Sequence, residues 1–153
     1  MSSAAQELRD LYREVILEHA RSPRNFGKLP GVTHQAQGIN PLCGDKLHVY
    51  LQIDDEGLIE GAGFEGSGCA ISVASASLLT ETVAGMTTDA ALDQFSTVIA
   101  SLTESDATAD GELGKLAALK GVREYPSRVK CATLAWRALA AAIHHEAEPA
   151  TTE

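Results

Sequence analysis

The chain has 153 residues, a formal net charge of −9 and 44% hydrophobic residues. This length suits one domain with its own core, and an acidic chain repels phosphate backbones, which argues against nucleic acid as a partner. No stretch approaches the ~20 apolar residues of a membrane helix, and the N-terminus lacks the apolar segment of a signal peptide, so we expect a cytoplasmic protein that does not bind membranes.

Hydrophobic spacing predicts a helix at the N-terminus. Two serines precede Ala4 and can cap it. Its apolar residues recur on one face at helical spacing, at Leu8, Leu11, Tyr12, Val15 and Ile16. The Ser22-Pro23 pair ends it.

Residues 45–53 alternate between apolar and polar side chains, which predicts a half-buried strand. The acidic, glycine-ended loop 54–57 leads to a returning strand over 58–64. A weaker strand is expected over 32–37. The glycines of segment 66–68 are expected to break the returning strand.

The rest of the chain is predominantly helical. Helices are predicted over 70–83, 88–102, 113–119 and 126–143, with an acidic loop at 103–112 and a flexible tail at 146–153. A helix, a few strands and then a run of helices indicate an α+β fold. We expect a small antiparallel sheet of about three strands with helices packed on one face.

Each of the three cysteines lies at the boundary of a predicted strand or helix. Their odd number argues against a disulfide framework, because cytosolic thiols stay reduced. Cys43 lies in a loop bracketed by proline and glycine, and Asp45, two residues on, points to the same side of an extended backbone. Cys69 opens a helix, where backbone N–H groups favour a thiolate. Cys131 follows Arg128 and Lys130, whose charges are expected to favour its thiolate as well.

Burial as a small hydrophobic residue is the alternative for each cysteine taken alone. The separations of 26 and 62 residues match no zinc finger. The shared setting nevertheless favours one metal site built from Cys43, Asp45, Cys69 and Cys131. Zinc and an iron–sulfur cluster both suit such ligands. Four anionic ligands would also need cations nearby, and by sequence these are Lys46, Arg128 and Lys130. Ser72, Ser75 and Ser77 are interpreted as helix-packing residues.

Three sequence motifs occur in order along the chain. They are Asn-Pro-x-Cys-Gly-Asp at 40–45, Gly-Ser-Gly-Cys-Ala-Ile-Ser-x-Ala-Ser at 66–75, and Arg-x-Lys-Cys-Ala-x-Leu-x-Trp at 128–136. Together with Leu11-Tyr12-Arg13 and Asn25-Phe26-Gly27, they resemble the SufU branch of the IscU-like (NifU N-terminal) iron–sulfur cluster assembly proteins. The resemblance covers about residues 8–145.

The resemblance implies a single IscU-like domain at 1–145, a SufU-type insertion at 103–125 and the flexible tail at 146–153. It implies that Cys43, Asp45, Cys69 and Cys131 bind zinc. Cys43 would accept persulfide sulfur from a SufS-type cysteine desulfurase and serve downstream iron–sulfur assembly proteins.

Two further residues bear on that role. Arg128 matches a position that the family uses at the desulfurase interface. Lys130 stands where the scaffold branch has a histidine, which favours a sulfurtransferase and adds a second cation at this face. The alternative is a scaffold that binds a transient iron–sulfur cluster on the same cysteines.

Overall fold

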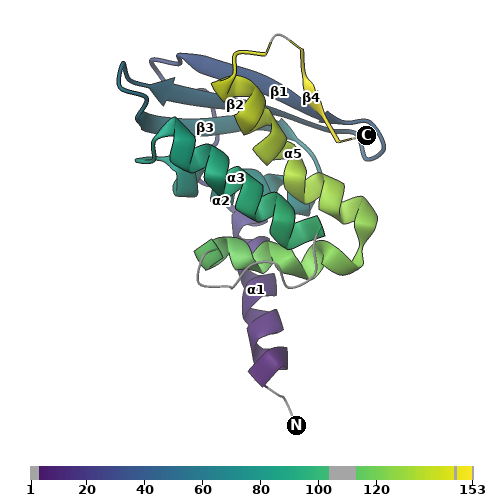
Figure 1. The fold of residues 1–153 in the computed structure, drawn as a ribbon. Helices are drawn as coiled ribbons and strands as arrows, with labels where there is room; N and C mark the ends of the chain where they lie inside the picture. Colours follow the sequence, from purple (N-terminus) through teal and green to yellow (C-terminus); the bar gives the residue numbers. More distant parts are fainter. Residues whose placement is uncertain (1–3, 104–112, 147, 153) are drawn as a thin grey trace.

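A mixed sheet with helices on one of its faces forms the architecture in this computed structural model (Figure 1). The structure describes residues 4–103, 113–146 and 148–152. Its elements, in chain order, are α1 (Ala4–Arg21), β1 (His34–Asn40), β2 (Asp45–Ile53), β3 (Ile59–Ser67), α2 (Ala70–Val83), α3 (Thr88–Thr103), the 3₁₀ helix η1 (Gly114–Glu124), α5 (Pro126–Ile143) and β4 (Ala150–Thr151).

The strand order is β3-β2-β1-β4. β1 pairs antiparallel with β2, β2 pairs antiparallel with β3, and β4 runs parallel to β1. The predicted α+β class, with helices on one face of the sheet, is confirmed. The predicted number of about three strands is too low by one, because β4 has only two residues and no pattern that marks a strand.

Strand β2 lies at the centre of the described sheet, and its alternating pattern produces the core. Leu47, Val49 and Leu51 are almost fully buried, as is Trp136 of α5. Gly38 of β1 lets α5 approach closely, because a Cβ at this position would lie 3.1 Å from Leu134 Cδ1. The close approach sets the N-terminal half of α5 beside the loop between β1 and β2.

Two strands reach further than their sequence patterns indicate. β1 begins at His34 and extends to Asn40, beyond the expected 32–37, so that Asn40 pairs with Asp45 across the hairpin. β3 extends past the expected end at residue 64, because Gly66 and Ser67 pair with Leu47 and Lys46. Gly66 has φ +133°, and a Cβ there would lie 2.2 Å from the Lys46 carbonyl oxygen, so only glycine lets the pairing continue.

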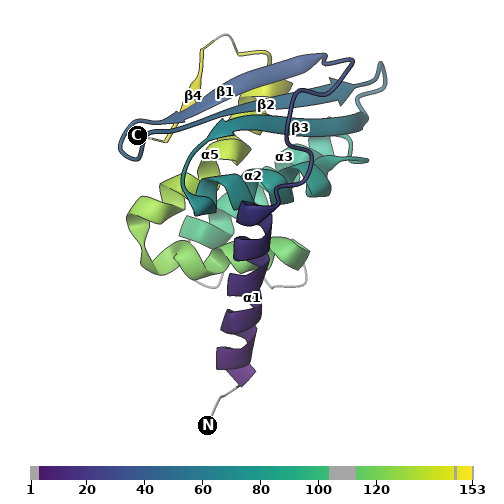
Figure 2. The same cartoon turned by 180° about the vertical axis from the view of Figure 1, so that it is seen from behind.

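Helix α1 extends away from the sheet (Figures 1 and 2) and is anchored to α2. His19 is buried; its Nδ1 lies 2.7 Å from Ser77 Oγ, and its Nε2 lies 3.6 Å from Glu81. The chain then crosses towards β3 (Figure 2), where Gly27 N–H donates to the Phe64 carbonyl at 2.7 Å and Phe64 N–H donates to the Asn25 carbonyl at 3.1 Å.

The C-terminal segment corrects one expectation. Residues 146–153 were expected to form a flexible tail, but Ala150 and Thr151 pair with Gly38 and Ile39 of β1. The unpaired backbone at the outer side of β1 offers hydrogen bonds that even a short segment can use. The helices predicted over 70–83 and 126–143 are confirmed, and the one predicted over 113–119 is instead the 3₁₀ helix η1, which continues to Glu124.

Most of the acidic segment expected to be a loop, and part of the expected insertion, lie outside the described residues. Thr103 alone of residues 103–112 is described, as the last residue of α3. Among the described residues, none of the helices combines the length and the hydrophobicity needed to span a membrane.

Candidate metal centre

Three separate parts of the fold bring the cysteines to one end of the sheet. Cys43 lies in the four-residue loop of the β1–β2 hairpin, where Gly44 takes φ +72° and its N–H donates to the Asn40 carbonyl at 2.9 Å. Cys69 is the N-cap residue of α2, and only Gly68 separates it from the end of β3. Cys131 lies in the second turn of α5. Burial increases along this series, since Cys43 is exposed, Cys69 is half-buried and Cys131 is fully buried.

Cys43, Asp45 and Cys131 form a tight group. Their possible ligand atoms all lie within 4.8 Å of one another, and the sulfur atoms of Cys43 and Cys131 are 3.8 Å apart. Asp45 is almost completely buried at the start of β2. A carboxylate in such a place requires hydrogen bonds or a cation to compensate for lost hydration.

Cys69 joins this group through Asp45. Its backbone N–H donates to Asp45 Oδ1 at 2.9 Å, and its sulfur lies 4.0 Å from Asp45 Oδ2. Gly68 makes this approach possible, because a Cβ there would lie 2.8 Å from Asp45 Oδ1. Cys69 is not within the 4.8 Å group itself, but all four predicted residues share one small region.

Two residues that the sequence analysis did not single out as site residues contact this group. Ser72 Oγ donates to Asp45 Oδ2 at 2.7 Å and lies 3.6 Å from Cys69 Sγ. Asn40 Nδ2 donates to Cys131 Sγ at 3.7 Å. The interpretation of Ser72 as a packing residue was therefore incomplete, and its position three residues after Cys69 on one helix face was the available signal. Asn40 carried no comparable signal from periodicity.

In the metal-free site the pKa values of Cys69 and Cys131 are shifted in opposite directions. Burial raises the pKa of Cys69, but the backbone and hydroxyl of Ser72 together with Cys131 stabilise its thiolate, and the net pKa is lowered. Burial, followed by interactions with Asp45 and Cys69, raises the pKa of Cys131. The expectation that Arg128 favours the Cys131 thiolate agrees with the hydrogen bond between the two residues, but burial and the neighbouring Asp45 and Cys69 still leave the pKa of Cys131 raised.

The predicted cations occupy different positions around the site. Arg128 is exposed, and a hydrogen bond with Cys131 and the charge of Cys69 raise its pKa, so its guanidinium faces the thiols. Lys130 lines a groove beside α5 that also includes Arg137. Lys46 lies exposed on β2. Of the three, Arg128 is the cation with a direct electrostatic link to the site.

The donor set fits a thiophilic metal. Three thiols and one carboxylate match the sulfur and oxygen ligands of tetrahedral zinc, and thiolates also ligate iron–sulfur clusters. One buried acceptor nearby, Asn40 Oδ1, has no hydrogen-bond partner among the described residues. Ser72 and the Cys69 N–H fix the orientation of the Asp45 carboxylate, as residues around metal ligands commonly do.

The sequence matches one known protein family over most of its length. The profile of the NifU-like N-terminal domain matches residues 11–146. The chain belongs to this family. The predicted membership in the IscU-like, NifU N-terminal group is thereby confirmed.

Relatives within the family carry two kinds of name. The zinc-dependent sulfurtransferase SufU of Bacillus subtilis is 39% identical over 137 residues, which are 89% of this chain and 91% of that protein. The iron–sulfur cluster assembly scaffold protein IscU of Streptococcus pyogenes is also 39% identical, over 94% of this chain and 89% of that protein.

Comparison with solved structures agrees with this family assignment. A crystal structure of the N-terminal part of a nitrogen-fixing NifU-like protein from Brucella abortus has a TM-score of 0.79 and 27% identity, and covers 92% of this chain and 99% of that one. This family member therefore has the fold of its relatives, and iron–sulfur cluster assembly is the process to which they point.

Proposed function

We propose that this protein is a zinc-dependent sulfurtransferase of cytoplasmic iron–sulfur cluster assembly. It accepts persulfide sulfur from a SufS-type cysteine desulfurase on Cys43 and serves downstream assembly proteins. The observation that carries the proposal is the contrast in burial: Cys43 is exposed at a hairpin tip, 3.8 Å from the fully buried Cys131. Cys43 is the most accessible of the three thiols, since Cys69 is half-buried and Cys131 is fully buried.

The chemistry follows from that arrangement. The Cys43 thiolate attacks the terminal sulfur of the desulfurase persulfide. A new S–S bond forms on Cys43, the S–S bond on the desulfurase breaks, and the desulfurase cysteine leaves as a thiolate. The transferred sulfur remains at the zero-valent level, so the exchange needs neither an oxidant nor a reductant.

The other residues have supporting roles. Cys43, Asp45, Cys69 and Cys131 would hold zinc, which keeps its thiol ligands ionised at neutral pH. Ser72 orients Asp45 and stabilises the Cys69 thiolate. Arg128 provides positive charge beside the thiols and, with Lys130, would face the desulfurase.

The surface around Cys43 suits a protein partner. Leu42, the preceding residue, is 73% exposed, and Tyr125, before α5, is 59% exposed. Leu42 lies in the same loop as Cys43, and Tyr125 directly precedes the helix that carries Cys131. A partner that covers these two positions would bury exposed apolar side chains, as the centre of a protein interface commonly does.

The test combines metal analysis with detection of the persulfide. The purified protein is mixed with a SufS-type desulfurase and cysteine, and its peptides are analysed by mass spectrometry. We expect about one zinc per chain and a 32-Da adduct on Cys43. Cys43→Ser should abolish the adduct. Full stimulation of the desulfurase by Cys43→Ser would disprove the sulfur-acceptor role.

A scaffold that carries an iron–sulfur cluster as cargo is the second candidate. The scaffold name of the Streptococcus pyogenes relative and the shared thiols at one site favour it. Anaerobic reconstitution with iron and sulfide separates the two functions. A stable visible absorption with transfer of the cluster to an acceptor apoprotein would support the scaffold, whereas zinc retained throughout would support the sulfurtransferase.

A further inference from the structure

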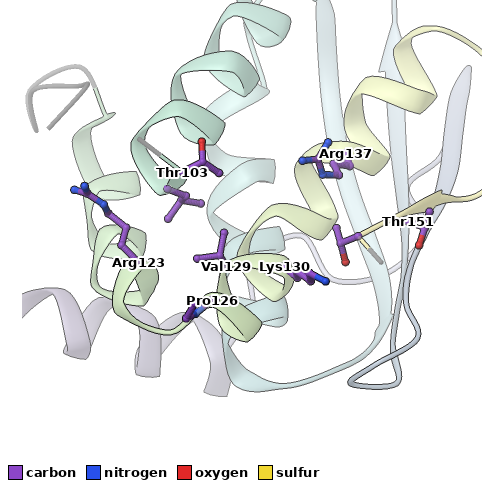
Figure 3. Close-up of a pocket in the computed structure, with 9 residues that line it drawn as sticks. Thr103, Arg123, Pro126, Val129, Lys130, Arg137 and Thr151 are labelled. Atoms are coloured by element: carbon purple, nitrogen blue, oxygen red, sulfur yellow. The ribbon is translucent and has the colours of Figure 1, made fainter. Parts of the chain in front are cut away.

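A groove beside α5 lies apart from the four candidate metal ligands. Its volume is about 630 Å³, within the range of small-molecule sites. It is lined from α3, η1, α5 and the C-terminal strand by Leu102, Thr103, Arg123, Pro126, Val129, Lys130, Arg137, Thr151 and Thr152. Figure 3 shows Val129, Lys130 and Arg137 along α5, with Thr103 and Thr151 on its two flanks.

The groove is basic on an acidic protein. Three of its lining residues, Arg123, Lys130 and Arg137, are cations, and no described carboxylate lines it. Within the described parts of the chain, none of the three forms an ion pair. Since the chain carries a net charge of −9, a local group of positive charges without partners concentrates anions at this place.

The cations of the groove come from two elements. Lys130 and Arg137 lie seven residues apart on α5, about two turns along one face of the helix. Arg123 of η1 lines the same groove. An anion in this groove would therefore meet positive charge from both α5 and η1.

The chemistry of the lining defines the acceptor. Arginine guanidinium groups match phosphate and carboxylate oxygens with paired hydrogen bonds, and lysine adds a point charge. Leu102, Pro126 and Val129 offer apolar surface to a carbon skeleton.

We propose that this groove binds a small organic anion that carries a phosphate or carboxylate group. The side chains of Lys130 and Arg137 contact its charged end, and the apolar residues contact the remainder. The groove does not include the four candidate metal ligands, but it shares Lys130 with the face proposed for the desulfurase. An anion bound there would lie against the same α5 that supports the metal centre.

The test measures binding of glycerol 3-phosphate and of succinate, which are weak zinc ligands, to the metal-loaded protein by isothermal titration calorimetry at low salt. One or both should bind, and which one does identifies the group. Arg123→Ala and Arg137→Ala should each weaken binding about tenfold or more.

Arg13→Ala, at an exposed arginine on α1, is the matched control and should leave binding unchanged. Equal losses in Arg13→Ala and Arg137→Ala would show unspecific attraction and overturn the proposal. So would the absence of binding by either anion. Binding that appears only after Glu104, Asp106, Asp110 and Glu112 are changed to their amides would assign the groove to the chain's own acidic segment, and would also overturn it.

Discussion

Ser72 donates its hydroxyl hydrogen to Asp45, and the two oxygen atoms are 2.7 Å apart although 27 residues separate them in the sequence. The same hydroxyl lies 3.6 Å from Cys69 Sγ and 3.4 Å from the Cys131 carbonyl oxygen. One buried hydroxyl group thus contacts parts of three of the four residues proposed to bind metal. The orientation of the Asp45 carboxylate depends on a residue that would not itself bind the ion.

Ser72→Ala should therefore weaken zinc binding by about 10- to 100-fold, as the loss of groups that orient metal ligands typically does. Competition with a chromophoric chelator measures the affinity. Ser75→Ala is the matched control, because the Ser75 hydroxyl donates to the Ala132 carbonyl and not to the site. Equal affinities for the two variants would contradict this role for Ser72.

Gly68→Ala should disturb the site from the other side of Asp45. The added methyl group would lie 2.8 Å from Asp45 Oδ1, so the carboxylate must move away from the Cys69 N–H. We expect less zinc in the purified variant, measured by atomic emission. Gly121→Ala is the control, since a Cβ at that position meets no atom within 4 Å. A full zinc content in Gly68→Ala would show that the carboxylate does not need this position.

The three thiols should differ in reactivity after the metal is removed by chelation. Cys131 is fully buried and its pKa is raised by burial and by its anionic neighbours, so it should be alkylated most slowly. Cys43 is exposed and Cys69 has a lowered pKa, so both should react earlier. Timed alkylation at neutral pH with peptide mass spectrometry measures the order. Rapid labelling of Cys131 would contradict the described packing.

Stability should decrease as the pH falls below about 6.5, the ordinary pKa of histidine. Burial, followed by the charge of Arg24, lowers the pKa of His19, so the unfolded chain takes up this proton more readily than the folded protein. The contribution of His19 to the free energy of unfolding is fully present above pH 6.5 and is lost as the pH falls below that value. Burial lowers the pKa values of His34 and His48 in the same direction.

Urea unfolding at several pH values tests this prediction. The pH dependence of the free energy of unfolding should be smaller in His19→Gln than in the unchanged protein. His144→Gln, at an exposed position, should retain the full dependence. An identical slope in all three proteins would exclude His19 as a source of the acid sensitivity.

The sequence was most informative where a pattern is repeated. The strict alternation of residues 45–53 predicted β2 with its observed bounds, and the long apolar spacing of 126–143 predicted α5. Short or strained features were missed. β4 has two residues, and β3 continues through Gly66 only because that glycine adopts a positive φ. Hydrophobic periodicity indicates neither the short strand β4 nor the extension of β3.

In the candidate site, too, the sequence predicted some features and missed others. Motifs pointed to Cys43, Asp45, Cys69 and Cys131, and the fold brings them to one region. The raised pKa of Cys131 was not foreseen, because neighbouring cations are visible in a sequence whereas burial and the approach of Asp45 and Cys69 are not. Asn40 was overlooked as a donor to Cys131 for a similar reason, since its partner lies 91 residues away.

The two outer strands of the sheet have consequences for how another chain can attach. β4 pairs with β1 at Gly38 and Ile39, and the Asn25–Gly27 backbone hydrogen-bonds to Phe64 of β3. At these positions an incoming strand finds the backbone groups already satisfied, which disfavours β-augmentation and edge-to-edge aggregation there. At these positions recognition would rely on side chains and loop tips, so substitutions at the surface there can change specificity for a partner without disturbing the sheet.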